Sequence, residues 1–465
     1  MSDIIYASAK TMAQAIQNKE ISAVELVDAH LARIEEVNPA LNAVVQIAAD
    51  RARAEAAEAD AAIARGESKG ALHGVPFTLK DSIDTEGIIT TGGTLGRKEY
   101  VPDADATVAA RLRAAGGILL GKTNTPELTL AGETNNLVYG QSNNPFDVSR
   151  TTGGSSGGAG AIVSTGGAAF DIGSDTGGSV RYPAHFCGIA GLKPNSGRVP
   201  RTGHIVPHSM GAVDSLTQNG PMARYVEDLA LLLPIISGPD WNDPAIVPMP
   251  LGDPADVDIS GLRVCFYTDN GIRTPTAETV AAVRAAADAL ADAGCTVTED
   301  VPSVIAENPD ISNMLSGGDG RAWTQRLLDK WGTTETHPWL TRRMERASEH
   351  QAEVGDFSGT LEMVDTFRSA MLGFVQHYDV IICPVSAFAA LPHGQSLERE
   401  NEPGMSYTGT YNITGWPSTV VRGGTSPDGL PIGVQAVSQP WREDVSLAVA
   451  QYLEGALGGW VKPPM

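Results

Sequence analysis

The sequence predicts an α/β fold, in which helices are layered on a β-sheet, because two hydrophobic periods alternate along the chain. The apolar runs 75–79 and 118–120 have the composition of buried strands, and a helical pattern lies between them at 107–115. A second strand–helix–strand pattern extends from 264 to 298. Such alternation is typical of a sheet covered by helices. No internal repeat and no shift of composition marks a domain boundary.

The amino-terminal part, residues 8–64, is expected to be helical. Ser22 can cap a first helix. Apolar residues at helical spacing form one stripe on that helix: Val24, Leu26, Val27, Leu31 and Ile34. A second, alanine-rich helix is expected over 42–64, and Gly66 is expected to end it.

The later elements follow from similar signals. Thr107 is expected to cap the helix 107–115, and Pro234 to stop a helix that begins at Val226. Residues 302–360 contain three tryptophans in a broken period, which predicts an irregular helical insertion over the core. The other expected elements are strands at 264–267, 296–298, 380–383, 420–421 and 432–437 and helices at 276–293 and 443–454.

Composition limits the class of protein. The 465 residues, 42% hydrophobic and 19% charged, suit one large globular domain or two to three smaller ones. Lys and Arg number 33 against 55 Asp and Glu, a net charge of −22. No basic cluster is present, so a nucleic-acid partner is not expected.

Targeting signals are not evident either. Residues 1–5 lack the basic and apolar regions of a secretory signal, and no run of 18 apolar residues predicts a membrane span. We expect a cytoplasmic protein, because the cysteines are far apart and are typical of buried free thiols in a reducing compartment. These are Cys187, Cys265, Cys295 and Cys383.

Two glycine-rich runs organise the centre of the chain. The first reads Gly-Gly-Ser-Ser-Gly-Gly at 153–158, and the second reads Asp-Thr-Gly-Gly-Ser-Val-Arg at 175–181. Folded proteins keep such runs where backbone approaches something closely or takes positive φ. A flexible linker is rejected, because Phe170 and Phe186 lie among them and require burial. Backbone N–H groups beside an embedded serine are components of an oxyanion hole.

Three other patterns resemble functional motifs and are rejected. Residues 116–123 match the P-loop spacing, but their Ile-Leu-Leu centre favours a buried strand. Residues 154–158 nearly match Gly-x-Ser-x-Gly, but no strand leads into them. His204 and His208 have a proline between them and no acidic partner nearby. We therefore expect no metal and no cofactor.

A serine in these runs would need a base, and no histidine lies within either run. A lysine can act as base when burial lowers its pKa. Lys80 directly follows the apolar run 75–79, which leaves two interpretations open, a buried base or a solvated lysine at a strand end. Lys122 follows a similar run and is a competitor, whereas Lys193 is interpreted as a loop anchor.

These features together resemble the amidase signature family. The resemblance rests on Lys80 and the two glycine-rich runs, extends through Gly-Leu-Lys-Pro at 191–194 to Gly-Val-Gln at 433–435, and is weakest in 300–400. It covers nearly the whole chain, and the signature is highly specific.

The resemblance implies a single large domain over 1–465 with a mixed central β-sheet layered between helices. Within it, amino-terminal helices would occupy 1–65 and the catalytic core 66–300 and 375–465. The insertion at about 302–360 would lie near the substrate entrance.

In that family a lysine, a serine on a cis peptide bond and a second serine form the catalytic triad, which here are Lys80, Ser155 and Ser179. The resemblance implies that Ser179 attacks an amide carbonyl while Ser155 relays its proton to neutral Lys80. The oxyanion would be held by the backbone N–H groups of Thr176, Gly177, Gly178 and Ser179. Asp175 and Arg181 would orient this loop, or Arg181 would bind a substrate carboxylate.

The substrate class is the open question. By position, Thr129, Leu130, Ile413 and Trp416 resemble residues that line the family's substrate pocket, although Trp416 is equally typical of a core aromatic. Their apolar character favours an aryl or alkyl amide, with hydrazides and carbamates as further members of the class. The alternative is the glutaminase subunit of a glutamyl-tRNA amidotransferase, which acts with partner subunits. A hydrolase of aryl or alkyl amides would have only a small-molecule amide as its partner. Whether the chain forms a homodimer is left open.

Overall fold

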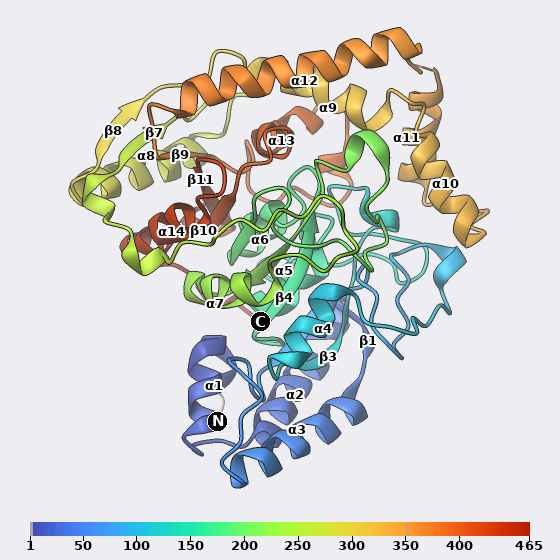
Figure 1. Cartoon of the computed structure of the whole chain (residues 1–465), viewed down its shortest axis with the longest axis vertical. Helices are drawn as coiled ribbons and strands as arrows, with labels where there is room; N and C mark the ends of the chain where they lie inside the picture. The colour runs from blue at the N-terminus through green and yellow to red at the C-terminus, as the bar shows by residue number, and fades with distance from the viewer. Residues whose placement is uncertain (1–2, 350) are drawn as a thin grey trace.

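A mixed sheet of 11 strands runs through residues 3–349 and 351–465, which are the residues that the computed structural model describes. Its order is β1-β3-β2-β4-β6-β5-β10-β11-β9-β7-β8, and helices flank it (Figure 1). The predicted single α/β domain with a mixed, helix-layered sheet is thereby confirmed. The strands are β1 (Val44–Ile47), β2 (Pro76–Lys80), β3 (Ile118–Thr123), β4 (Phe170–Asp175), β5 (Ala190–Lys193), β6 (Gln218–Ala223), β7 (Arg263–Phe266), β8 (Thr296–Glu299), β9 (Val380–Pro384), β10 (Ser418–Thr425) and β11 (Pro431–Ser438).

The helices follow the expected alternation with these strands. The strands and helices expected after residue 260 are present, with bounds shifted by a few residues. The α-helices are α1 (Ala9–Gln17), α2 (Ala23–Leu41), α3 (Ala49–Ala64), α4 (Thr107–Ala114), α5 (Gly157–Ser164), α6 (Arg181–Cys187), α7 (Val226–Ile236), α8 (Ala277–Asp292), α9 (Asn308–Gly317), α10 (Ala322–Trp331), α11 (Pro338–Glu349), α12 (Val354–Val375), α13 (Ser406–Ile413) and α14 (Glu443–Leu457).

The centre of the sheet positions both glycine-rich runs. β2 and β4 are parallel neighbours, with Thr78 opposite Asp171. Lys80 is the last residue of β2, and β4 ends at Asp175, where the second run begins. The carboxyl ends of parallel strands meet at one edge of a sheet, which is where α/β proteins place their sites. The lysine and both runs are therefore brought to the same edge.

The amino-terminal helices fold largely as expected. Ser22 and Glu25 form a capping box, in which the Ser22 side chain accepts from the Glu25 amide (3.1 Å) and the Glu25 carboxylate accepts from the Ser22 amide (2.9 Å). The second helix is shorter than predicted, because Val44–Ile47 form β1, which pairs antiparallel with β3. Asn42 ends α2 with φ +47°, and the β-branched residues after it favour an extended strand.

Two helix ends also differ from the predictions. Ala106, not Thr107, is the N-cap of α4, because the Thr107 hydroxyl donates to Asp240 (2.7 Å) instead. Pro234 lies inside α7 rather than ending it. The Ser237 amide and hydroxyl both donate to the Leu233 carbonyl (3.1 and 2.6 Å), which closes the last turn beyond the proline.

The insertion is more regular than expected, because residues 302–360 form α9, α10, α11 and the start of α12. Figure 1 shows α12 as a long helix across one end of the molecule, with α10 and α11 at its side. Trp323 and Trp339 are buried in a second hydrophobic core that also contains Phe367. The three tryptophans all lie within α10 and α11, near the ends of these short helices, so their broken period reflects a change of helix and not an irregular chain.

Other expectations concern single residues. Residues 118–123 form the buried strand β3, which confirms that they are not a P-loop. All four cysteines are free and buried. In the described part of the chain, no helix is long and apolar enough to cross a membrane. The same residues contain no group of three or more His, Cys, Asp or Glu side chains that could hold a metal ion.

Candidate active site

Lys80 lies at the centre of a group of serine hydroxyls. Its Nζ is 2.6 Å from Ser155 Oγ and 3.0 Å from both Ser156 Oγ and Ser174 Oγ. These groups come from the end of β2, the start of α5 and the end of β4, and Lys80 has no exposed surface. Lys80 is therefore surrounded by hydroxyls, and no carboxylate bonds to it directly.

Burial also decides the charge of this lysine. Desolvation lowers the pKa of Lys80 to about 7, although Asp171 and Asp175 oppose the shift by favouring the charged form. At neutral pH a substantial fraction of Lys80 is a neutral amine with a free lone pair. The sequence left two interpretations of Lys80 open, a buried base and a solvated lysine at a strand end, and the structure supports the buried one.

The two competing lysines point elsewhere. Burial lowers the pKa of Lys122 to about 8, but its Nζ donates to the Ile83 carbonyl and to Thr85 (2.7 Å) and does not contact Ser155. Lys193 is buried in β5, not in a loop as expected, and its Nζ donates to the Pro194 carbonyl at 2.9 Å. Of the three, only Lys80 hydrogen-bonds to a glycine-rich run within the described residues.

Close packing explains the glycines around Ser155. The Gly154–Ser155 peptide bond is cis. A Cβ at Gly154 would lie 2.6 Å from the Ala131 carbonyl, and one at Gly158 would lie 2.6 Å from the Ala43 carbonyl. The backbone at 131–133 is therefore pressed against the glycine that precedes Ser155.

Ser179 follows β4 in the second glycine-rich run, where the surface opens. Ser179 and Thr176 are half-buried and Gly177 is exposed, whereas Ser155 is 1% exposed. Within the described residues the Ser179 hydroxyl has no hydrogen-bond partner. Ser179 is thus accessible to solvent, whereas Ser155 is enclosed, and the Ser156 amide donates to the Ser179 carbonyl (3.2 Å), which holds the two runs side by side.

The amides of this loop correct one prediction. Gly178 N–H donates to Asp175 Oδ1 at 2.8 Å, so it is not free to bind an oxyanion. The amides of Thr176, Gly177 and Ser179 make no hydrogen bond to any described residue. Gly178 instead has a conformational role, because its φ is +131° and a Cβ there would lie 2.5 Å from Thr408 Oγ1.

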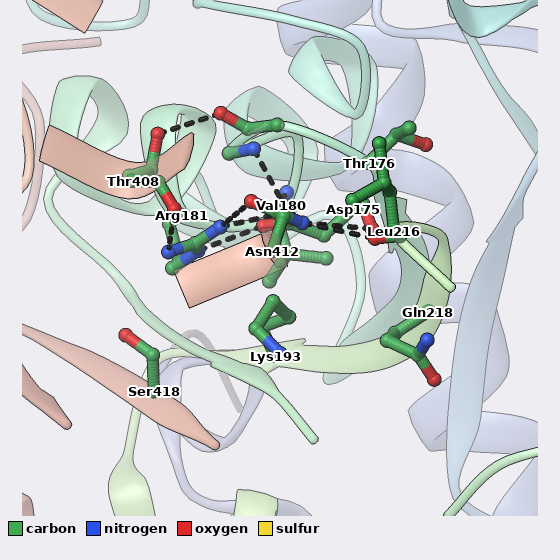
Figure 2. Close-up of polar contacts among 12 residues, drawn as sticks. Asp175, Thr176, Val180, Arg181, Lys193, Leu216, Gln218, Thr408, Asn412 and Ser418 are labelled. Carbon is green, nitrogen blue, oxygen red and sulfur yellow. Dashed lines mark hydrogen bonds and ion pairs between the residues drawn. The ribbon is translucent and has the colours of Figure 1, made fainter. Parts of the chain in front are cut away.

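Asp175 and Arg181 form a buried ion pair under the loop (Figure 2). The Arg181 Nε and Nη2 donate to Asp175 at 3.0 and 2.9 Å, and Arg181 also donates to the Thr408 carbonyl (3.0 Å) and to Asn412 (2.5 Å). Burial disfavours the Asp175 carboxylate, but Arg181 outweighs it and holds the pKa of Asp175 well below its usual value. Arg181 has no exposed surface, so the alternative that it binds a substrate carboxylate is wrong.

The four predicted pocket residues do not form one lining. Leu130 is half-buried and belongs to the segment that packs on Gly154, whereas Thr129 beside it is buried. Ile413 and Trp416 are 0% and 3% exposed and lie in the second hydrophobic core. The prediction that Ile413 and Trp416 line a pocket is therefore wrong, and Trp416 is a core aromatic.

Replacing Trp416 by alanine should lower the free energy of unfolding by about 3–5 kcal/mol, because it leaves a cavity in that core. Urea denaturation followed by circular dichroism measures the change. The control is Trp241→Ala, since Trp241 is 92% exposed and its loss should change the free energy of unfolding by no more than about 0.5 kcal/mol. A wild-type stability for Trp416→Ala, with a raised KM for apolar amides, would show that Trp416 contacts substrate after all.

Several residues near Lys80 were not anticipated. Ser156, Ser174 and His204 join the hydrogen bonds around it, and Asp171 influences its charge. The two serines stand inside or beside the glycine-rich runs, so the runs themselves were a signal. His204 was considered only as a metal ligand, and its contact with Ser174 depends on the fold.

Comparison with known proteins agrees with this fold and shows the family. The family model described as Amidase matches residues 25–447, so the chain belongs to the amidase signature family and is an enzyme that hydrolyses amide C–N bonds. It is 35% identical over 480 residues to one of the subunits of glutamyl-tRNA(Gln) amidotransferase from Synechococcus sp. (strain CC9605), with 95% of each chain covered. It is 35% identical over 468 residues to an acylamidase of Rhodococcus erythropolis, covering 96% of this chain and 94% of the relative. The solved structure of 6-aminohexanoate cyclic dimer hydrolase complexed with substrate has a TM-score of 0.88 and 30% identity, with 99% of both chains covered.

Proposed function

We propose that the protein hydrolyses a small carboxylic amide through an acyl-enzyme on Ser179, with Ser155 relaying a proton to neutral Lys80. The observation that carries this proposal is the 2.6 Å contact between Lys80 Nζ and Ser155 Oγ, in surroundings that lower the pKa of Lys80 to about 7. A base of that pKa is half neutral near pH 7 and can still return the proton it accepts.

The proposed acylation uses these three side chains in turn. Ser179 Oγ attacks the carbonyl carbon, its proton passes to Ser155 Oγ, and the Ser155 proton passes to Lys80 Nζ. The C–N bond then breaks, and the proton returns from the Lys80 ammonium through Ser155 to the departing amine. A water molecule attacks the acyl-enzyme by the same relay, which releases the carboxylic acid and restores Ser179.

The negative charge of each tetrahedral intermediate needs donors that face the substrate. The amides of Thr176, Gly177 and Ser179 supply them in our proposal, since Gly178 is occupied by Asp175. The buried Asp175–Arg181 pair acts on the loop from behind. It fixes the carboxylate that holds Gly178 and thereby keeps the free amides in place before substrate binds.

We propose an aryl or alkyl amide as substrate, with hydrazides and carbamates as related candidates. Free glutamine would need a cation for its carboxylate, and Arg181 beside the loop is already paired and buried. By contrast, Leu130 and Ala131, in the segment beside Gly154, are apolar and only partly buried where they pack on the second hydrophobic core. Burying apolar surface there contributes about 25 cal/mol per Å² to binding.

Aryl and medium-chain alkyl amides should therefore have a catalytic efficiency at least about tenfold higher than glutamine, which is about 1.4 kcal/mol in the barrier. Measuring kcat/KM for benzamide, an anilide, hexanamide and glutamine on the purified chain tests this. Glutamine as the best substrate would instead support the second candidate function, the glutaminase subunit of an amidotransferase, to which the chain is as similar in sequence as it is to the acylamidase.

We also propose that the 302–360 insertion borders the substrate entrance. The His337 amide donates to Glu127 (2.7 Å), and Arg343 donates to the Leu130 carbonyl (3.3 Å), so α11 is tied to the segment that packs on Gly154. For the amino-terminal helices we propose the bounds 1–65, and for the two parts of the core 66–300 and 375–465. Four free cysteines support a reducing, cytoplasmic location.

A further inference from the structure

His204 is a buried histidine beside the catalytic lysine that the proposed mechanism does not use. It lies between β5 and β6 and is 4% exposed. Its Nε2 is 2.9 Å from Ser174 Oγ and 3.0 Å from Ser82 Oγ. Its Nδ1 is 3.1 Å from both the carbonyl and the amide of Val206. His204 thus reaches Lys80 through the single hydroxyl of Ser174.

The surroundings of His204 keep its ring neutral. Burial, followed by the charge of Lys80, lowers the pKa of His204 to about 3, and Arg201 and Arg97 act in the same direction. The charged groups that act on Lys80 itself are Asp171 and Asp175 on β4, with Lys122 of β3 acting on Asp171. A neutral imidazole has one nitrogen that donates and one that accepts.

The hydroxyl of Ser174 lies between two possible acceptors for its one hydrogen. Lys80 Nζ is on one side at 3.0 Å and His204 Nε2 on the other at 2.9 Å. If the hydrogen points to Lys80, it occupies the lone pair that must accept the proton of Ser155. If it points to His204, the Ser174 oxygen accepts an N–H of Lys80 and leaves that lone pair free. The second arrangement requires the tautomer with Nδ1–H, which donates to the Val206 carbonyl (3.1 Å). The other tautomer would accept the Val206 amide at Nδ1 (3.1 Å) and donate Nε2–H to Ser174, whose hydrogen would then point to Lys80.

We propose that His204 is a positioning residue that accepts the Ser174 hydrogen and so directs the lone pair of Lys80 to Ser155. Ser156 then accepts the second N–H of the neutral amine, which accounts for all three hydroxyls around Lys80. This inference rests on the proposed function, in which Lys80 is the base.

The variant His204→Phe removes the acceptor and keeps a ring in place. We expect kcat to fall about 10- to 100-fold with KM changed by less than about twofold, because one hydrogen bond is reversed and no substrate contact is lost. The fall of kcat/KM on the acid side of the pH profile, called the acid limb below, should move to lower pH. The reason is that a hydroxyl that donates to Lys80 favours the neutral form of the lysine. The enzyme would then be slower although more of its base is deprotonated.

A double variant and two controls complete the test. Ser174→Ala/His204→Phe should be faster than His204→Phe alone, because the competing hydroxyl is gone. His204→Gln keeps an acceptor and should recover at least about half of the lost rate on a logarithmic scale. Ser82→Ala touches the same nitrogen but not Lys80, and it should stay within about twofold of wild type. His204→Leu also lacks the acceptor and replaces His204→Phe if that variant does not fold.

Three results would overturn the inference. The first is an acid limb that moves toward the ordinary pKa of lysine, which would mean that His204 only excludes water. The second is that the effects of Ser174→Ala and His204→Phe on the rate simply add in the double variant. The third is that His204→Phe has the rate of the wild type. Lys80→Met is measured in parallel, because full activity in that variant would refute the base assignment itself, whereas an inactive Lys80→Met with an unaffected His204→Phe would refute only the role of His204.

Discussion

Replacing Ser179 by alanine should lower the rate of amide hydrolysis by at least about 10⁴-fold while the fold is retained, because removal of a nucleophile leaves only binding and oxyanion stabilisation. Ser179 is half-buried and its hydroxyl makes no contact that the fold requires among the described residues. Steady-state release of amine from an anilide measures the rate, and circular dichroism checks the fold.

Covalent labelling separates Ser179 from its neighbours. A serine-directed fluorophosphonate should modify Ser179 in the wild-type protein and leave Ser179→Ala unlabelled. The control is Ser149→Ala, at an exposed serine outside the two glycine-rich runs. This variant should be labelled by the fluorophosphonate and should hydrolyse the anilide as the wild type does. An adduct on Ser156, found by mass spectrometry of the digested protein, would refute the assignment of the nucleophile.

Replacing Lys80 by methionine should lower kcat/KM by about 10²- to 10⁴-fold at pH 8, the range that general-base catalysis usually contributes. In the wild type the pKa of Lys80 is about 7, so activity should fall as pH drops through 7 and the amine gains a proton. In the variant that acid limb should disappear, and the residual rate should rise with hydroxide concentration.

Lys193→Met provides the matched control. It also removes a buried lysine whose pKa is lowered to about 7 by burial, but Lys193 bonds to the Pro194 carbonyl and not to a serine. In the pH profile of Lys193→Met, the fall of activity on the acid side should have the same midpoint pH as in the wild type. A wild-type profile that is flat from pH 5 to 9, in protein shown to remain folded, would contradict a lysine base.

The sequence pointed to the residues of the proposed reaction more directly than to the residues that surround them. Lys80, Ser155 and Ser179 stand in or beside runs whose glycine content is hard to explain without a site. The contacts that define the environment of Lys80 span 75 to 94 residues, and burial of its amine depends on how β2 and β4 pack. The residues alone could not decide between a base and a solvated lysine, because only the packed sheet removes water from Nζ.

Distance along the chain also explains the wrong alternative for Arg181. Its partners Thr408 and Asn412 lie 227 and 231 residues later, so its pairing was not visible from local sequence. The strand β6 was not anticipated because Gln-Asn-Gly-Pro-Met-Ala is a poor strand sequence, and its position between β4 and β5 overrides local preference. The Ser22 cap and the buried apolar runs 75–79 and 118–120, which depend on near neighbours, were predicted correctly, whereas the helix ends at Thr107 and Pro234 were not.

The topology has a consequence for the order in which the active site is completed as the chain folds. Lys80 and both glycine-rich runs are synthesised within the first 181 residues, yet Arg181 and the loop it supports depend on α13, which begins at Ser406. The strand β10 pairs with β5 and so joins the half of the sheet that carries Lys80 to β11, β9, β7 and β8, and it is made later still. Contacts between such distant segments close late in folding. A nascent chain therefore carries every reacting group long before it can hydrolyse an amide, and the onset of activity during synthesis or refolding reports that its carboxyl-terminal third has docked.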